Sequence, residues 1–284
     1  MVTAPAFFPA GNGGSVAVHD LGGDGEPLLL AHATGFHGLT FRRLAGYLSG
    51  RFHCLALDFR AHGLSRAGDG WGGEWEGFSE DLLAVVSGMA LGHPRAFGHS
   101  CGGAALLLAE EAVPGTFRHL YCYEPVVAPL LDPPPPDDDQ LLSQRALRRR
   151  ERFGSRAEAL SNFSSKPPLC VLDPDVLRDY VDFGFADSDD GSVTIRCRPA
   201  DEALIYAHGL SHRAFADLPK VRCPVDLACG GETAAYGEDV LQAMAERLGG
   251  RRITVFRQLG HFGPLEQPQL IAEAMIRAFE TPPA

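Results

Sequence analysis

The sequence predicts an α/β fold, in which a mostly parallel, doubly wound sheet carries helices on both of its faces. Three observations lead to this prediction. Short apolar runs alternate with longer amphipathic segments along most of the chain. Some runs, such as residues 27–32 (PLLLAH), are almost continuously apolar, as expected for strands that are buried on both faces. A regular strand–helix order is typical of parallel sheets, because each parallel neighbour needs a crossover connection.

The first half of the chain supplies five expected strands and three expected helices. Strands are indicated by short apolar or alternating runs, and helices by longer segments with a 3.6-residue apolar period. The expected strands cover residues 15–22, 27–32, 53–58, 95–99 and 119–124. The expected helices cover residues 39–48, 78–91 and 104–113, and Ser79 is the expected N-cap of the second.

The alternation stops in the middle of the chain and resumes in its last quarter. Residues 129–139 (PLLDPPPPDDD) predict a rigid, charged connector, because proline fits neither a helix interior nor an inner strand. Residues 140–153 (QLLSQRALRRRERF) then predict a basic amphipathic helix. We therefore expect a mostly helical insertion over residues 127–218, within a core domain formed by residues 1–126 and 219–284. The remaining core strands are expected at 224–230 and 252–257, and the remaining helices at 239–249 and from 264.

Composition narrows the class of partner. The net charge of −11 argues against nucleic acid and anionic membrane surfaces. No stretch approaches the roughly 18 apolar residues of a membrane helix, and the N-terminus does not resemble a signal peptide, so we expect a cytoplasmic protein. The seven cysteines are odd in number and lack metal-site spacing, which predicts buried free thiols and no zinc site. We expect a small-molecule substrate and no cofactor, and the oligomeric state stays open.

Residues 98–102 (GHSCG) place one serine between two glycines, where an expected strand gives way to an expected helix. A turn at this point is very sharp, and Gly98 and Gly102 leave room for it. The turn would project the Ser100 hydroxyl above the carboxyl edge of the sheet, beside a helix N-terminus that favours negative charge. Because the glycine spacing centres the turn on Ser100, we predict that Ser100 is the nucleophile and that Cys101 is not.

The chain resembles the α/β-hydrolase superfamily in this turn and in three further motifs. Residues 31–36 (AHATGF) resemble its His-Gly-type loop after the third strand. Residues 57–65 (LDFRAHGLS) resemble its Asp-x-Arg-Gly-His-Gly-x-Ser turn, with Ala61 in place of a glycine. Residues 259–268 (LGHFGPLEQP) resemble its C-terminal histidine loop. The insertion follows the sixth strand, where the superfamily carries a cap.

The resemblance implies a catalytic histidine. A serine hydroxyl such as that of Ser100 is a poor nucleophile and needs an adjacent base. His261 lies in the loop after the last strand, as the base of the superfamily does, and an unperturbed histidine pKa near 6.5 suits this role. His32, His62 and His99 also lie in superfamily motifs, but there they are expected to hold loops in place.

The position of the acid departs from the common pattern. The superfamily usually carries a Gly-x-x-Asp after strand seven, where this chain has Thr233 or Ala234. Glu124 stands just past strand six, where some haloalkane dehalogenases carry their acid. We therefore predict Glu124 as the acid, with a salt bridge that anchors the cap as its alternative role. Glu232 is the second candidate, and Asp226 lies too early in its strand.

An oxyanion intermediate needs two backbone N–H donors. The resemblance implies Cys101, the residue after the nucleophile, as one donor. The other is expected from the 32–36 loop, at Thr34 or, as the second choice, at Gly35.

The chain order Ser100, Glu124, His261 predicts a serine hydrolase that opens a small, apolar ester, lactone or thioester through an acyl-serine. A serine nucleophile does not fit the aspartate chemistry of dehalogenases and epoxide hydrolases. Two alternatives stay open: a carbon–carbon bond hydrolase with the same triad, and a ligand receptor that retains a triad. Apolar residues of the cap either line a pocket or form its own core: Phe153, Phe163, Leu169, Tyr180, Phe183, Phe185 and Tyr206.

Overall fold

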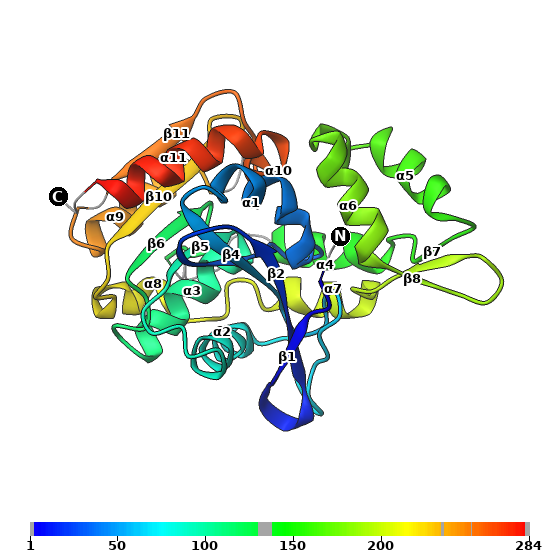
Figure 1. Cartoon of the computed structure of the whole chain (residues 1–284), viewed down its shortest axis with the longest axis horizontal. Coiled ribbons are helices and arrows are strands. Elements are labelled where there is room, and N and C mark those ends of the chain that lie inside the picture. Colours follow the sequence, from blue (N-terminus) through cyan, green and yellow to red (C-terminus); the bar gives the residue numbers. More distant parts are fainter. Residues whose placement is uncertain (1–2, 130–137, 234–235, 251, 282–284) are drawn as a thin grey trace.

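The computed structural model describes residues 3–129, 138–233, 236–250 and 252–281. Its centre is an eight-stranded sheet with the strand order β1-β2-β4-β3-β5-β6-β10-β11. The pairs β1–β2 and β2–β4 are antiparallel, and the other neighbours are parallel. Helices cover both faces (Figure 1). The predicted α/β class with a mostly parallel, doubly wound sheet is confirmed.

The observed elements of the core follow the predicted ones closely. The strands are β1 (Ala6–Pro9), β2 (Ser15–Gly22), β3 (Glu26–Ala31), β4 (Phe52–Asp58), β5 (Arg95–His99), β6 (His119–Tyr123), β10 (Val225–Gly230) and β11 (Ile253–Phe256). The helices are α1 (Arg42–Leu48), α2 (Glu76–Gly88), α3 (Cys101–Ala112), α9 (Glu238–Arg247), α10 (Gly263–Glu266) and α11 (Pro268–Glu280). Strand β1, which forms a hairpin with β2, was not predicted. The N-cap prediction for Ser79 is wrong, because α2 begins at Glu76 and the Ser79 hydroxyl donates to its carbonyl at 2.7 Å.

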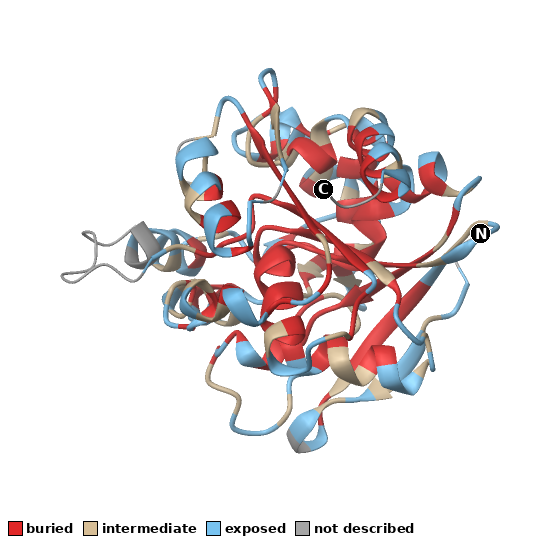
Figure 2. Cartoon of the chain, turned by 90° about the vertical axis from the view of Figure 1, so that its left-hand side faces the viewer, coloured by how far each residue is buried: buried red, intermediate tan, exposed pale blue. Residues whose placement is uncertain are grey.

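Two apolar clusters lie on opposite faces of the sheet. One packs α2, α3 and α9 against the strands, through residues such as Phe78 and Leu106. The other packs α1 and α11, through residues such as Leu44 and Met275. Figure 2 shows the buried sheet between partly exposed helices. Burial on both faces explains why the inner strands are apolar along their whole length.

The segment between β6 and β10 contains five helices and a small sheet among its described residues. The helices are α4 (Asp138–Leu147), α5 (Arg156–Ser164), α6 (Pro174–Gly184), α7 (Pro199–Ala207) and α8 (Ala214–Asp217). The short strands β7 (Arg152–Phe153), β8 (Phe185–Asp187) and β9 (Val193–Ile195) form a three-stranded antiparallel sheet, which was not predicted. Residues 130–137, most of the predicted proline-rich connector, lie outside the described residues.

Buried hydrogen bonds join this segment to the core. The indole of Trp75, just before α2, donates to the Ile205 carbonyl on α7 at 2.9 Å. The Asp173 N–H, just before α6, donates to the Leu265 carbonyl on α10 at 2.9 Å. The segment is therefore held against the core by at least two of its helices, which fixes the walls of the space between them.

All seven cysteines are free, and six of them are buried as predicted. Cys170 is the exception: it is exposed on a short 3₁₀ turn (Leu169–Val171) of the inserted segment. Among the described residues, no group of three or more His, Cys, Asp or Glu side chains is arranged to hold a metal ion. No helix in the described part of the chain is long and apolar enough to span a membrane.

Candidate active site

Ser100 occupies a strained turn between β5 and α3. Its φ of +56° and ψ of −117° are rarely adopted by residues other than glycine. A Cβ on Gly98 would lie 2.6 Å from the backbone of Gly102, and a Cβ on Gly102 would lie 2.2 Å from the Ala31 carbonyl oxygen. A side chain at either glycine would therefore clash with neighbouring backbone, which explains the glycines on both sides of the serine.

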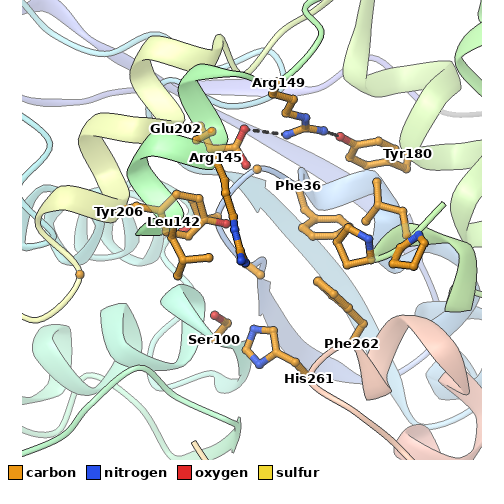
Figure 3. Close-up of a pocket in the computed structure, with 18 of the residues that line it drawn as sticks. Phe36, Ser100, Leu142, Arg145, Arg149, Tyr180, Glu202, Tyr206, His261 and Phe262 are labelled. Atoms are coloured by element: carbon orange, nitrogen blue, oxygen red, sulfur yellow. Dashed lines mark hydrogen bonds and ion pairs between the residues drawn. The ribbon is translucent and has the colours of Figure 1, made fainter. Parts of the chain in front are cut away.

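Ser100 opens into a cavity of about 740 Å³ between the core and the inserted segment (Figure 3). The walls are mostly apolar and come from both parts of the chain. Core residues on the walls include Phe36, Trp75 and Phe262, and residues of the inserted segment include Phe163, Leu169, Tyr180 and Tyr206. Of the other apolar residues expected in the cap, Phe153 and Phe185 belong to a buried apolar cluster, and Phe183 lies against the Arg42 guanidinium.

His261 is held by Glu124. The distance from His261 Nδ1 to Glu124 Oε2 is 2.6 Å, and Glu124 is fully buried. Two further donors reach the same carboxylate: the Gly230 N–H at 2.8 Å and the Thr233 hydroxyl at 2.9 Å. Hydrogen bonds to both oxygens fix the carboxylate in one orientation and leave His261 Nε2 available on the other side of its ring.

The other candidate acids lie elsewhere. Glu232 is exposed, and its N–H donates to the Leu259 carbonyl at 3.0 Å. Asp226 is on β10, where it accepts a hydrogen bond from His119 Nε2 at 2.8 Å. Among the described residues, Glu124 is the carboxylate within hydrogen-bond distance of the His261 ring.

Two side chains fix the loop that carries His261. His99 Nε2 donates to the His261 carbonyl at 2.8 Å, and the Tyr123 hydroxyl donates to the Gly260 carbonyl at 2.8 Å. Burial holds the pKa of His99 well below its ordinary value, so the ring stays neutral and carries one N–H for this bond. His99 therefore has the loop-holding role that was predicted for it.

Ser100 and His261 lie side by side at one end of the cavity (Figure 3). In the described part of the chain, no hydrogen bond joins the Ser100 hydroxyl to the His261 ring. Contacts between a nucleophile and its base are often long before substrate binds, and they shorten in the complex. The two side chains line the same cavity, which allows such a contact to form in a complex.

The 33–36 turn lines the cavity and carries both expected backbone donors, Thr34 and Gly35. The Phe36 N–H donates to the Ala33 carbonyl at 3.1 Å, and Gly35 has a φ of +80°, as the third residue of a type II turn requires. The Gly35 N–H donates to His62 Nε2 at 3.0 Å and is therefore already used. Thr34 N–H has no acceptor among the described residues, so the geometry favours it over Gly35 as a donor to substrate.

Cys101 is the first residue of α3, and its N–H is one of the helix-start donors that have no partner within the helix. Its side chain is fully buried, and burial raises the pKa of the thiol to about 12. A thiol with this pKa stays protonated at neutral pH and is a poor nucleophile. The burial of Cys101 fits the prediction that its backbone, and not its sulfur, faces the reaction.

Two arginines of the inserted segment also line the cavity. Arg149 donates to Glu202 at 2.7 Å and to the Tyr180 hydroxyl (Figure 3). Arg145, one helical turn earlier, points toward Ser100 and His261. The Arg149 side chain, within the segment predicted as a basic amphipathic helix, is therefore mostly buried rather than solvent-exposed.

Comparison with known proteins identifies the family. Residues 28–274 match the profile described as the alpha/beta hydrolase family, and this span is most of the chain. The chain belongs to the alpha/beta hydrolase family. The resemblance inferred from its motifs is therefore confirmed.

Curated relatives match this alpha/beta hydrolase only in part. A 2-(acetamidomethylene)succinate hydrolase of Mesorhizobium japonicum is 31% identical over 96 residues, which is 34% of each protein. A magnesium-chelatase 30 kDa subunit of Rhodobacter capsulatus is 35% identical over 89 residues, or 31% of each. The chain thus aligns with about a third of the length of these relatives.

Solved structures match this alpha/beta hydrolase over nearly its whole length. E-2-(acetamidomethylene)succinate hydrolase superposes with a TM-score of 0.86 at 20% identity, covering 99% of this chain and 100% of that one. An esterase from Exiguobacterium antarcticum superposes with a TM-score of 0.76 at 17% identity, covering 97% and 99%. At these identities, the likeness establishes the fold.

Several site residues of this alpha/beta hydrolase were not found from the sequence. Tyr123 and Thr233 hold the histidine loop and the acid through side-chain contacts between residues more than a hundred positions apart. Nothing in the sequence signals such pairs. Arg145 and Arg149 both lie in the segment predicted as a basic amphipathic helix, but only Arg145 is on the observed helix, which ends at Leu147.

Proposed function

We propose that this alpha/beta hydrolase cleaves a small carboxylic ester, lactone or thioester through an acyl intermediate on Ser100. His261 Nε2 takes the proton of the serine hydroxyl as its oxygen attacks the carbonyl carbon. Glu124 keeps the Nδ1–H of His261 directed toward itself, so that Nε2 is the free base. The observation that supports this most strongly is the 2.6 Å contact between His261 and Glu124 beside the serine.

The backbone N–H groups of Thr34 and Cys101 would stabilise the oxyanion that forms on the carbonyl oxygen. His261 then gives its proton to the leaving alkoxide or thiolate, and later takes one from the water that hydrolyses the acyl-serine. We also propose that residues 127–218 form a cap over a core made of residues 1–126 and 219–284. The cavity walls support this division, since they combine residues from both parts.

A non-ester substrate is the second candidate. The relative from Mesorhizobium japonicum is named as a hydrolase of 2-(acetamidomethylene)succinate, a compound that is not an ester. The same three residues also suit the hydrolysis of a carbon–carbon bond next to a ketone. Product analysis separates these cases from ester hydrolysis, and multiple turnover of any substrate argues against a ligand receptor.

Substitution of the proposed nucleophile tests the proposal. Ser100→Ala should lower kcat for a soluble ester by about 10⁴–10⁶-fold, as in other serine triads. It should also abolish covalent labelling by a fluorophosphonate. Cys101→Ala, the matched control at the neighbouring position, should keep most of the activity, because only its backbone is used. A fluorophosphonate label that maps to Cys101, or ester turnover without any label, would contradict the proposal.

A further inference from the structure

Arg145 places a positive charge at the cavity. It lies in the last turn of α4 and extends toward Ser100 and His261 (Figure 3). Among the described residues, no carboxylate forms an ion pair with it. Most of the surface around it is apolar, including Leu142, next to it on the same helix, and Phe36. Arg145 is itself exposed, so its guanidinium is accessible to an anionic partner in the cavity.

The other charges of the cavity do not supply that partner. Glu202 is the one carboxylate among the described residues that line the cavity, and it is taken by Arg149 at 2.7 Å. Lys166 donates to the neutral amide oxygen of Asn162 at 2.9 Å. The cavity lining therefore holds more positive than negative charge, although the whole chain has a net charge of −11.

The position of Arg145 at a helix C-terminus offers a simpler explanation. A cation there interacts favourably with the helix dipole, and this effect alone favours an arginine near the end of α4. It does not account for a side chain that points into the cavity. Arg148, three residues later, is exposed and is not among the residues that line the cavity. It provides a matched comparison.

We propose that Arg145 binds a carboxylate carried by the substrate. The substrate class then narrows from apolar esters in general to small esters with an apolar carbon chain and one carboxylate. A guanidinium forms two parallel hydrogen bonds to a carboxylate, and these are stronger in an apolar cavity than in water. The inference deepens the proposed function and depends on it for the position of the reacting carbonyl at Ser100. The carboxylate belongs either to the acyl group or to the leaving group.

Paired substrates test the proposal. 4-Nitrophenyl hemisuccinate and 4-nitrophenyl butyrate differ in acyl charge, and 4-carboxyphenyl acetate and 4-methylphenyl acetate differ in leaving-group charge. In one of the pairs, Arg145→Gln should lower the kcat/KM ratio of charged to neutral ester by about tenfold or more, the usual effect of a charge-assisted hydrogen bond. Arg148→Gln, with the same change in net charge, should preserve the ratio. If Arg145→Gln leaves the kcat/KM ratio of charged to neutral ester unchanged in both pairs, the proposal is overturned.

A binding measurement separates this inference from the proposed function. Monomethyl succinate and monomethyl glutarate are titrated calorimetrically into the Ser100→Ala protein, with and without Arg145→Gln. Suppose that the wild-type protein hydrolyses none of the esters, but that anion binding depends on Arg145. This result would support the inference and refute the proposed function. Ester turnover with Arg145-independent ratios would leave the function standing and refute the inference. Anion binding that Arg145→Gln leaves unchanged would also refute it.

Discussion

Backbone strain is concentrated at the proposed catalytic residues. Ser100 and Glu124 have φ values of +56° and +43°, and they are two of the four non-glycine residues with positive φ in the described part of the chain. Such conformations cost about 1–3 kcal/mol each and persist only where neighbouring structure imposes them. Here the sheet imposes them: the Ser100 N–H bonds the Tyr123 carbonyl at 2.9 Å, and the Glu124 N–H bonds the Ala228 carbonyl at 2.7 Å. This strain fixes where both side chains point.

The role of Glu124 can be tested by a single-atom change. Glu124→Gln should leave the fold intact and lower kcat by up to about 10⁴-fold, because the amide no longer holds the imidazole in the productive tautomer. Glu232→Gln is the matched control, and it should stay close to wild type because Glu232 is exposed. Both variants are compared by kcat on one soluble ester, with circular dichroism as a check on folding. A near-normal Glu124→Gln beside a crippled Glu232→Gln would contradict the assignment.

At the residue scale, the sequence was informative where chemistry is tied to local spacing. The glycines around Ser100 and the substitution at Ala61 are of this kind, since Ala61 does adopt a left-handed φ of +64° where the superfamily has glycine. The sequence alone does not show whether Thr34 or Gly35 has the free backbone N–H. This depends on a hydrogen bond from Gly35 to His62, which lies on another loop.

At the element scale, periodicity predicted the long strands and helices and missed the short ones. Strands β7, β8 and β9 contain two or three residues each, too few to show an alternating pattern. The start of α2 was placed at Ser79 because serine is a common N-cap. The observed N-cap, Trp75, has no side-chain cap and is positioned instead by its contact with α7.

Trp75 links two elements, and its loss should destabilise the protein. Trp75→Phe removes the donor to the buried Ile205 carbonyl, and we expect the free energy of unfolding to fall by about 1–3 kcal/mol. Trp71→Phe is the control: its indole donates to the Glu74 carbonyl within the same partly exposed loop, so the expected loss is smaller. Urea unfolding followed by circular dichroism measures both. Equal losses in the two variants would argue against a special role of the Trp75 contact.

At the scale of the whole molecule, buried histidines should make stability depend on pH. Burial lowers the pKa of His32 to about 3 and that of His37 to about 4, and it also lowers the pKa of His62, His99 and His212. In the unfolded chain these groups titrate near 6.5, so below about pH 6.5 the unfolded state binds more protons than the folded state. Each of these histidines therefore lowers the stability as the pH falls.

Carboxyl groups whose pKa is raised act in the opposite direction. Burial raises the pKa of Glu111 to about 8 and that of Asp179 to about 6, so the folded state holds these protons more tightly. The pKa values of Asp81 and Glu266 are also raised, by smaller shifts, so the five histidines outweigh the four carboxyl groups. The free energy of unfolding should therefore fall between about pH 6 and 5, by about 1.4 kcal/mol per pH unit for each net proton that unfolding takes up. Urea unfolding at a series of pH values measures this slope. A flat profile between pH 7 and 5 would show that the histidines are not held neutral.

The fold class and most core strands were predictable because each parallel strand is an apolar run followed by a covering helix. The order of the strands in the sheet was not predicted. Nor was the arrangement of the cavity. Its walls depend on contacts such as that of Trp75 with Ile205, which join residues 130 positions apart. Such contacts are set by tertiary packing, and no local pattern encodes them.

The hydrogen bond between Thr233 and Glu124 has a consequence for how related sequences are classified. β6 and β10 are adjacent strands, and Thr233, one of the two positions where the family's usual acid would fall, touches the position that carries a carboxylate here. A comparison restricted to a single alignment column would find threonine and class this chain as a catalytically dead pseudoenzyme. A comparison that scores the Glu124 and Thr233 columns together accepts a carboxylate at either position, because the two strands are neighbours. It would keep such chains among the candidate active enzymes.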